Sequence, residues 1–332
     1  MKKKVLIMSQ HFDRSTDIVL QWLNYYGASY IRVNHGDVLK VRKINIDKGN
    51  TEITIRHNSV EFSLSEITGF WYRRGNVGFA WDELKSNELA LERAIGAVNK
   101  HLKGEISTLE EYFYFQLEQL TTSLGRRSNA RNNKLIHLEM AKLCGLNIPD
   151  TIIVANKQDL SERIHGRTNI TKAIRDGLSV GIKGKSDMWR YFSTYTSIAN
   201  HEIIEQAEKE FFPFLLQQQI KKKYEIRVFY LNGELFSMAI FSQNDPQTVV
   251  DFRHYNYQRP NRMVPYVIDA ETTDKIKRFM KIANLNTGSL DLICSDKDEL
   301  FFLEVNPVGQ FGMVSFPCNY YLEKKIAEYL IS

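Results

Sequence analysis

The chain of 332 residues is 43% hydrophobic and 25% charged, and these proportions exclude an intrinsically disordered protein. No apolar run approaches the roughly 20 residues that a membrane-spanning helix needs, so we expect no membrane partner. The three cysteines form no CxxC pair, which argues against a zinc site or a disulfide framework and favours reduced thiols in the cytoplasm. The net charge of +5 favours an acidic partner such as a nucleotide, a carboxylate-rich peptide or a nucleic acid.

Residues 1–124 predict an N-terminal α/β domain that opens with a β-α-β unit. The apolar run 5–8 predicts its first strand, and no GxGxxG follows, so a dinucleotide fingerprint is absent. Apolar residues at helical spacing from Ile18 to Tyr26 predict a helix that Ser15 or Thr16 caps and Gly27 ends. Further strands are predicted at 30–34, 41–46, 51–56, 60–64 and 68–73, and a helical pattern runs from about 81 to 124.

The polar, basic stretch 126–133 lacks apolar periodicity and predicts a domain boundary. After it, helices are predicted at 134–144 and 273–283, and strands at 150–154, 169–175, 190–198, 214–219, 225–231, 234–241, 288–294 and 300–305. Asn232-Gly233 predicts a tight turn between two of these strands. The stretch 176–188 contains three glycines and predicts a loop. Helices and strands of this number predict a mixed α/β (α+β) fold class.

Three oxygen-bearing side chains are candidates for a metal site. Asp291 lies in one predicted strand, and Glu304 and Asn306 lie two residues apart on the next, where they face the same side. If the two strands pair, all three side chains face one pocket. Two carboxylates and an amide carbonyl are hard ligands that suit Mg²⁺. Taken alone, the pattern also fits the exposed polar face of an ordinary hairpin.

Two lysines and the glycine-containing stretch favour a phosphate ligand. Lys172 lies in a predicted strand between apolar neighbours and can direct its ammonium group to a phosphate. The stretch 176–188 has small residues, which let backbone N–H groups approach phosphates, and it suits a lid. Lys134, at the start of a predicted helix, is a second candidate, although a solvated lysine is commoner there.

The order and spacing of these residues resemble the ATP-grasp superfamily. The resemblance covers about residues 125–315 and rests, in chain order, on Lys134, the run 145–149, Lys172, the run 214–220, Glu225-Ile226-Arg227, Asp291 and the run 303–307. Over nearly the full chain, the sequence is most similar to the graspetide peptide maturases of the microviridin, or grasp-with-spasm, type. This closer similarity rests on the runs 71–74, 241–245, 248–253, 259–266 and 305–311.

The resemblance implies an ATP-grasp fold with a pre-ATP-grasp domain at 1–124, a central lobe at 125–205 and a C-terminal lobe at 206–332. The two lobes are expected to clamp ATP, with Mg²⁺ held by Asp291, Glu304 and Asn306. Lys134 and Lys172 would contact the α- and β-phosphates. Gln217, Gln218, Gln219 and Ile220 would form a hinge that carries adenine, with backbone groups of Gln219 and Ile220 reading its edge. The sequence departs from the common pattern at Gln218, where an acidic residue is frequent.

Four further residues receive roles through the resemblance. Glu225 would bind ribose or orient the site. Arg227 and Arg253 would face the γ-phosphate and the acyl phosphate, with Asp251 orienting Arg253 or the nucleophile. A surface ion pair between Asp251 and Arg253 is the alternative for that pair, since the two lie two residues apart on a possible strand.

The implied activity is that of an ATP-dependent ligase acting on a ribosomal precursor peptide with a leader and an acidic core. Asp or Glu side chains would be activated as acyl phosphates and joined to Thr or Ser hydroxyls or Lys amines, giving ester or amide macrocycles, ADP and phosphate. We expect the leader to dock near Lys185, Arg190, Lys221, Lys222 and Lys223. Arg73 and Arg74 are candidate peptide-binding residues, or merely part of an edge strand. A homodimer is also implied.

Two other functions remain open at this point. An ATP-grasp amino-acid, dipeptide or protein-tail glutamate ligase would share every nucleotide-binding residue. A non-enzymatic peptide- or nucleic-acid-binding module would use the basic run 221–223 with Tyr255 and Tyr257, and would bind in a salt-sensitive way. That module leaves the metal-ligand candidates without a role, so we expect no nucleic-acid partner.

Overall fold

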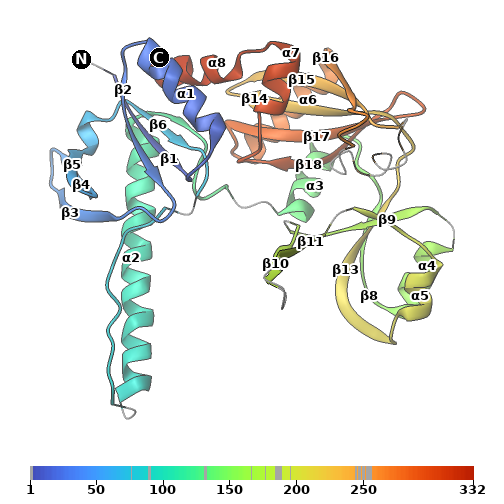
Figure 1. The fold of residues 1–332 in the computed structure, drawn as a ribbon, viewed down its shortest axis with the longest axis horizontal. Helices are drawn as coiled ribbons and strands as arrows, with labels where there is room; N and C mark the ends of the chain where they lie inside the picture. Colours follow the sequence, from blue (N-terminus) through green and yellow to red (C-terminus); the bar gives the residue numbers. More distant parts are fainter. Residues whose placement is uncertain are drawn as a thin grey trace. The chain divides into compact units, whose positions relative to one another are not determined.

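The computed structural model describes residues 3–75, 77–88, 91–130, 133–165, 167–175, 177–183, 189–194, 196–243, 245, 248, 251 and 256–332. Its contacts divide the chain into two compact units (Figure 1). Unit 1 comprises Met1–Ala130 and Tyr321–Ser332, and unit 2 comprises Arg131–Tyr320. The division at residue 130 falls inside the polar stretch 126–133. The last twelve residues join unit 1, whereas the sequence analysis placed them in a C-terminal lobe.

Unit 1 is built on a parallel four-stranded sheet of order β2-β1-β6-β7. Its elements are β1 (Lys4–Ser9), α1 (Arg14–Tyr25), β2 (Ser29–Asn34), β3 (Leu39–Ile46), β4 (Thr51–His57), β5 (Val60–Ser63), the 3-10 helix η1 (Leu64–Glu66), β6 (Gly69–Tyr72), α2 (Glu92–Leu120), β7 (Thr122–Leu124) and α8 (Leu322–Leu330). Strands β3, β4 and β5 form a separate antiparallel sheet. β1 lies in the centre of the parallel sheet, and its residues from Val5 to Ser9 are fully buried.

The two faces of β6 meet different helices, because successive side chains of a strand point to opposite sides. The rings of Phe70 and Tyr72 contact Tyr114 of α2. On the other face, a Cβ added to Gly69 would lie 2.2 Å from the backbone oxygen of Leu330 in α8. The C-terminal helix therefore completes the core of unit 1.

Two sequence predictions in unit 1 were wrong in detail. Asp13, rather than Ser15 or Thr16, caps α1, and its carboxylate accepts the Ser15 N–H at 3.2 Å. The long helix starts at Glu92 and not near 81. Before it, Leu84 exchanges hydrogen bonds of 2.9 Å with the Asn99 side chain, so this segment runs beside the helix instead of extending it.

Unit 2 contains two antiparallel sheets and a hairpin. Its elements are α3 (Lys134–Leu143), β8 (Thr151–Asn156), α4 (Lys157–Ile164), β9 (Asn169–Lys172), β10 (Ser179–Lys183), β11 (Trp189–Ser193), β12 (Ser197–Ala199), α5 (His201–Gln206), β13 (Glu210–Gln218), β14 (Lys222–Leu231), β15 (Glu234–Phe241), β16 (Arg262–Tyr266), α6 (Ala270–Ile282), β17 (Thr287–Ser295), β18 (Leu300–Asn306) and α7 (Gly312–Cys318). The sheets have the orders β12-β9-β13-β8 and β16-β15-β14-β17-β18.

Each sheet of unit 2 buries one face under helices. Residues of α3 and α6 pack with Ile226, Val228, Leu290 and Phe302 of the five-stranded sheet into the largest core cluster of the unit. Leu216 of the four-stranded sheet packs with residues of α4. The opposite faces carry polar side chains such as Arg227 and Gln217, but apolar residues are buried there too: Phe229 of β14 packs against Phe311.

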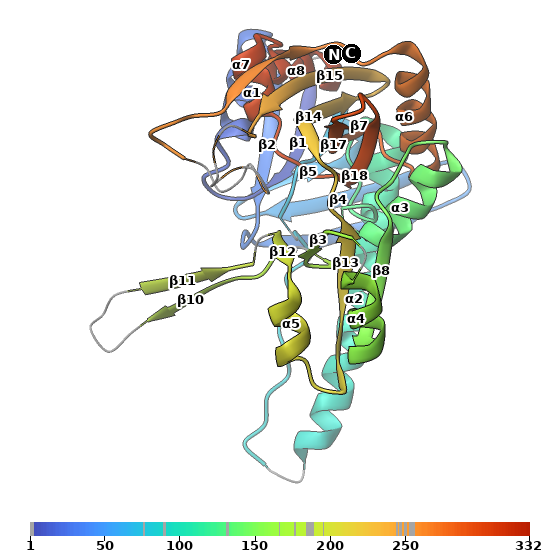
Figure 2. The ribbon, with the colours of Figure 1, turned by 90° about the vertical axis from the view of Figure 1, so that its right-hand side faces the viewer.

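Two boundaries in unit 2 differ from the sequence prediction. β13 pairs with β8 and β9, so it belongs to the sheet of the central lobe and not to a lobe that starts at 206. The stretch 176–188 was predicted as a loop, but its residues 179–183 form β10, which pairs with β11. Figure 2 shows this hairpin extending away from the four-stranded sheet. By contrast, the turn at Asn232-Gly233 is confirmed, with φ of 42° and 101°.

Replacing Gly69 by Ala should destabilise unit 1, because the new Cβ would lie 2.2 Å from the Leu330 backbone oxygen. Overpacking of this kind costs about 1–3 kcal/mol. Gly96→Ala is the matched control: it lies on an exposed turn of α2 with nothing within 4 Å of the added Cβ, and should stabilise by about 1 kcal/mol. Thermal unfolding measures both, and an unchanged Tm for G69A would contradict the packing of α8 on β6.

Candidate functional site

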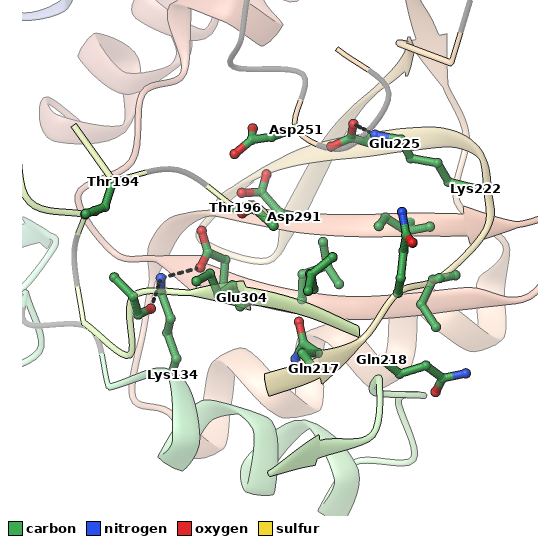
Figure 3. Close-up of a pocket in the computed structure, with 18 residues that line it drawn as sticks. Lys134, Thr194, Thr196, Gln217, Gln218, Lys222, Glu225, Asp251, Asp291 and Glu304 are labelled. Atoms are coloured by element: carbon green, nitrogen blue, oxygen red, sulfur yellow. Dashed lines mark hydrogen bonds and ion pairs between the residues drawn. The ribbon is translucent and has the colours of Figure 1, made fainter. Parts of the chain in front are cut away.

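A pocket lies in unit 2 and is lined by both of its sheets (Figure 3). The residues around it are Lys134, Ile170, Lys172, Ala173, Gly177, Thr194, Thr196, Gln217, Gln218, Gln219, Ile220, Lys222, Glu225, Asp251, Asp291, Ile293, Leu303 and Glu304. Most residues named from the sequence as nucleotide or metal ligands are therefore brought together. The apolar residues Ile170 and Ile293 lie two positions from Lys172 and Asp291, and strand alternation could have identified them.

Three charged residues lie side by side across three neighbouring strands. Arg227 of β14 is the register partner of Asp291 on β17, which is in turn the partner of Glu304 on β18. The guanidinium Nη1 of Arg227 donates a hydrogen bond to Oδ1 of Asp291. Two carboxylates thus stand next to each other on the pocket face of the sheet, with a cation on the outer side of Asp291.

A bulge in β18 adds Leu303 to the pocket face beside Glu304. Asp291 pairs with Glu304 but the next residue, Leu292, pairs with Phe302, so Leu303 is an extra residue in β18. Such an extra residue re-aims the side chains around it. As a result Leu303 and Glu304 both line the pocket, while Phe302 and Val305 are buried in the core on the other face.

Lys134 compensates the second carboxylate. It is the first residue of α3, which Asn133 caps through a 3.2 Å bond from the Ile136 N–H. Its Nζ lies 3.2 Å from Oε2 of Glu304 and donates to the Ala173 carbonyl at 3.1 Å. The charges therefore follow the order cation, carboxylate, carboxylate, cation from Arg227 through Asp291 and Glu304 to Lys134. The last three line the pocket, and Arg227 lies beside it against Asp291.

The four-stranded sheet contributes Lys172 and Gln217 from adjacent strands. Ile170 is the register partner of Gln217, and Lys172 lies on the same face of β9. Gln217 is fully buried; its Nε2 donates to Thr151 Oγ1 at 2.8 Å, and its Oε1 has no hydrogen-bond partner among the described residues. A buried amide oxygen of this kind can accept a hydrogen bond from a ligand N–H, because a buried acceptor without a hydrogen bond costs free energy.

The hinge residues after Gln217 use some of their backbone groups internally. The Gln218 N–H donates to the Asp150 carbonyl at 2.8 Å, and the Gln219 N–H donates to the Thr168 carbonyl at 3.0 Å. The Gln219 N–H is thus engaged within the protein. If the hinge reads an adenine edge, the groups for it are the Gln219 carbonyl and the Ile220 N–H.

Glu225 is buried at the edge of the pocket with two donors on one oxygen. Its Oε1 accepts from the Lys222 ammonium and, at 2.9 Å, from Ser242 Oγ. Burial raises the pKa of Glu225 above its ordinary value, while Lys222 and then Ser242 oppose that rise. Lys222 and Glu225 are three apart and share a face because Lys223 is an extra residue in β14.

Three sequence predictions are only partly reflected in this geometry. Asn306 does not line the pocket, and its Oδ1 accepts the Val308 N–H at 3.1 Å within the turn after β18. Lys222 was expected on a basic leader-binding surface, but its side chain is only 6% exposed and faces Glu225. The exposed neighbours Lys221 and Lys223 pair with Asp296 and Asp298 instead.

Of the remaining candidates, Asp251 lines the pocket, and the others lie elsewhere or outside the described residues. Asp251 is also buried. Arg190 lies on β11, on the hairpin of unit 2. Arg73 and Arg74 follow β6 in unit 1, where both contact Asp13. Arg253 and Lys185 lie outside the described residues.

The donor set of the pocket fits a hard divalent cation. Mg²⁺ binds proteins through one or two carboxylates and fills the rest of its shell with phosphate oxygens and waters. Asp291 and Glu304 supply two such carboxylates on adjacent strands. In the part of the chain that the structure describes, no three His, Cys, Asp or Glu side chains gather around one point. No helix of the described residues is long and apolar enough to cross a membrane.

Comparison with known proteins identifies the fold. No family model and no curated protein matches the chain. A RiPP-associated ATP-grasp ligase of Chryseobacterium gregarium, solved with ADP and a leader and core peptide, is 22% identical, with a TM-score of 0.73 over 99% of this chain and 95% of that one. The macrocyclase MdnC of Microcystis aeruginosa, bound with the precursor peptide MdnA, is 22% identical, with a TM-score of 0.71 over 99% of both chains. The ATP-grasp ligase PsnB, complexed with minimal precursor, Mg and ADP, is 14% identical, with a TM-score of 0.69 over 98% of this chain and 96% of that one. The chain therefore has the fold of the ATP-grasp ligases, as the sequence analysis expected.

Removing the Lys222 charge should cost more stability at high pH than at low pH. The pKa of the buried Glu225 is already raised, and without Lys222 it should rise further. A carboxyl whose folded pKa exceeds its unfolded value favours folding below the unfolded value, and this contribution is lost as pH rises through the folded value. We expect Lys222→Met to lower the free energy of unfolding by about 3–5 kcal/mol near pH 8 and by less near pH 5.

Lys221→Met is the matched control for this change. Lys221 is 86% exposed and lies 3.5 Å from Asp296, so its loss should cost about 0–1 kcal/mol at both pH values. Urea unfolding at the two pH values measures the difference. An equal loss for K222M at both would show that Glu225 does not depend on Lys222 for its charge.

Proposed function

We propose that this chain is an ADP-forming ATP-grasp ligase that activates side-chain carboxylates of a ribosomal precursor peptide and closes them into ester or amide rings. The observation that carries the proposal is a row of charges in which Asp291, Glu304 and Lys134 line a pocket between two sheets, and Arg227 pairs with Asp291 beside it. Paired carboxylates flanked by cations suit a magnesium-bound polyphosphate, because they match both its metal and its anionic oxygens.

Each part of the pocket has a role in holding the nucleotide. Bound Mg²⁺–ATP would supply the γ-phosphoryl group that turns a poor acylating carboxylate into an acyl phosphate. Asp291 and Glu304 would hold the metal, and Lys134 and Lys172 would pair with phosphate oxygens. The buried Gln217 Oε1 would accept from the base, and Glu225 would bind the ribose with its orientation fixed by Lys222 and Ser242.

Arg227 and Asp251 would act nearer the reacting groups. Arg227 already lies against Asp291, so its guanidinium stands where charge builds up on the transferred phosphoryl group. Asp251 is 4% exposed on the pocket wall and would orient the attacking hydroxyl or amine. Arg253 would face the acyl phosphate. Asn306, the last residue of β18, would support the site by accepting the Val308 N–H of the turn that follows.

The peptide substrate is supported by the proteins that share the fold over the full chain. The Chryseobacterium ligase, MdnC and PsnB were each solved with a precursor or with leader and core peptides. The hairpin of this chain offers a surface for a leader: Val180, Ile182, Trp189 and Phe192 are between 38% and 57% exposed. Arg190 lies among them, opposite Ile182. A homodimer and a cytoplasmic location remain predictions from the sequence.

An amino-acid or protein-tail glutamate ligase is the second candidate, since it would use the same nucleotide pocket. The two differ in the acceptor. A peptide ligase needs an extended surface for its substrate. The exposed apolar hairpin provides such a surface and favours the peptide ligase over the amino-acid ligase.

Asp291→Asn and Glu304→Gln should each weaken ADP binding in the presence of Mg²⁺ by at least about tenfold, the effect of losing roughly 1.4 kcal/mol. A neutral amide is a poorer metal ligand than a carboxylate, so ADP affinity without Mg²⁺ should change less. Calorimetric titration with and without Mg²⁺ measures this. Asp296→Asn, in the exposed turn after β17, is the control and should behave as the wild type. Preserved Mg²⁺ dependence in both variants would remove these carboxylates from the metal site.

Incubation with ATP, Mg²⁺ and a candidate precursor peptide encoded beside the gene should reduce the peptide mass by about 18 Da per ring, because each condensation removes one water. ADP should form in equal amount. The Asp251→Asn variant should bind ADP normally and form rings more slowly. ATP turnover with free amino acids and none with peptides would instead favour the amino-acid ligase.

A further inference from the structure

Thr151 supports Gln217 from outside the pocket of unit 2. Gln217 of β13 is the register partner of Thr151 on β8 and of Ile170 on β9, so the three side chains lie on one face of the sheet. Gln217 and Ile170 line the pocket, whereas the lining does not include Thr151. Thr151 can therefore act on a bound molecule only through Gln217.

The Thr151 hydroxyl fixes the orientation of the Gln217 amide. Its oxygen Oγ1 donates a hydrogen bond to the Pro149 carbonyl at 2.9 Å, which uses the one hydrogen of the hydroxyl because a carbonyl can only accept. Towards Gln217 the hydroxyl can then only accept, and it accepts from Nε2 at 2.8 Å. The reverse orientation of the amide would place two acceptor oxygens against each other with no hydrogen between them. The amide nitrogen is thus held against β8, and the amide oxygen is directed away from it.

The turn that carries the Pro149 carbonyl is itself fixed. The next residue, Asp150, accepts two hydrogen bonds at its backbone carbonyl, from the Gln218 N–H at 2.8 Å and from Nη2 of Arg163 at 3.0 Å. These bonds tie the turn to β13 on one side and to α4 on the other. The Pro149 carbonyl therefore stays within reach of the Thr151 hydroxyl, and the hydroxyl cannot reverse its role.

The amide oxygen of Gln217 is the acceptor that this arrangement leaves for a ligand. It is buried and has no hydrogen-bond partner among the described residues. In Figure 3 the Gln217 side chain extends from β13 into the space between the two sheets. A donor N–H satisfies such an oxygen, whereas a second acceptor in that place leaves both oxygens unpaired at a cost in free energy. The position therefore favours a ligand that presents an amine and disfavours one that presents a carbonyl.

The hinge next to Gln217 defines which part of a base this amide would meet. The Gln219 carbonyl and the Ile220 N–H are the hinge groups for a purine edge. An exocyclic amine on C6 carries two hydrogens, so one would go to the Gln219 carbonyl and the other to Oε1 of Gln217. A 6-oxopurine such as hypoxanthine or guanine presents an acceptor oxygen in place of that amine.

We propose that Thr151 is a specificity-determining residue: by fixing the Gln217 amide with its oxygen toward the base, it makes the pocket select 6-aminopurine over 6-oxopurine nucleotides. The inference rests on the proposed function, because it takes the pocket as the site of a purine nucleotide. It goes beyond that function because neither Thr151 nor its partner Pro149 would contact the nucleotide. Thr151 is thus a positioning residue that acts through Gln217.

Calorimetric titration with ADP and with inosine diphosphate (IDP), both with Mg²⁺, tests the proposal. The wild type should bind ADP about a hundredfold more tightly, because IDP leaves the buried Oε1 of Gln217 unpaired. Thr151→Val keeps the shape of the side chain and removes the hydroxyl, so the amide can turn its Nε2 toward the base. ADP affinity should then fall about threefold and IDP affinity should rise about threefold, which reduces the preference to about tenfold.

Two matched variants separate this effect from a general loss of stability. Thr151→Ser keeps the hydroxyl and should keep the wild-type preference. Thr171→Val makes the same exchange on β9, at the register partner of Leu216 on the opposite face, and should also keep it. An unchanged preference in T151V would overturn the proposal. Equal weakening of ADP and IDP in T151V would do so too, because it would give Thr151 a structural role only.

The wild type provides a test that does not depend on the folding of any variant. Purine riboside diphosphate carries hydrogen in place of the C6 amine and should bind about tenfold more weakly than ADP, because it offers neither acceptor a hydrogen. Equal affinities for the two would overturn the proposal. ADP binding with no preference over IDP would defeat this inference alone, whereas absence of ADP binding in the wild type would defeat the proposed function.

Discussion

The pairing of partly buried charges at the pocket is the constraint on which the rest of unit 2 depends. Asp291 and Glu304 stand next to each other on adjacent strands, where two carboxylates repel and lose hydration. Arg227 on one side and Lys134 on the other compensate them. This requires β14, β17 and β18 to stay in one register and α3 to start where it does, since a slip of one residue would turn a charged side chain into the core.

The opposite face of the same sheet supplies the force that keeps this register. Val228, Leu290 and Val305 alternate with the charged residues and pack against α3 and α6. Apolar burial of this extent is worth about 1.5–3 kcal/mol per large side chain, so the core outweighs the cost of holding a few ions together. Two neighbouring carboxylates can therefore be held together without loss of the fold. α3 contributes to both effects, because it packs into the core and carries the Lys134 ammonium that pairs with Glu304.

Unit 1 also holds charged side chains close together, in a smaller group. Asp13 is placed by its role as the cap of α1, and the glycine turn after β6 directs two arginines to it. In both units, carboxylates and guanidinium groups are brought together by strand ends and registers and not by neighbours in the chain. Cations and anions held in this way are preorganised, so a charged ligand meets groups that are already in position.

The sequence by itself determined which side chains could meet. Strand alternation placed Glu304 on a polar face. The order of Lys134, Lys172, Gln217, Glu225 and Asp291 along the chain resembles the ATP-grasp superfamily, and this resemblance implied a nucleotide pocket and an ATP-grasp fold. Only the tertiary structure decided on which face of its strand each of these side chains lies. One extra residue in β14 turned Lys222 from an expected surface lysine into the partner of Glu225, and one in β18 put Leu303 on the pocket face and Phe302 in the core. These bulges reverse the alternation of the strand, but no residue type in the sequence signals them, because they arise from how two strands pair. For the same reason, the meeting of Asp13 with Arg73 and Arg74, some 60 residues apart in the chain, could be seen only once β1 and β6 lay side by side.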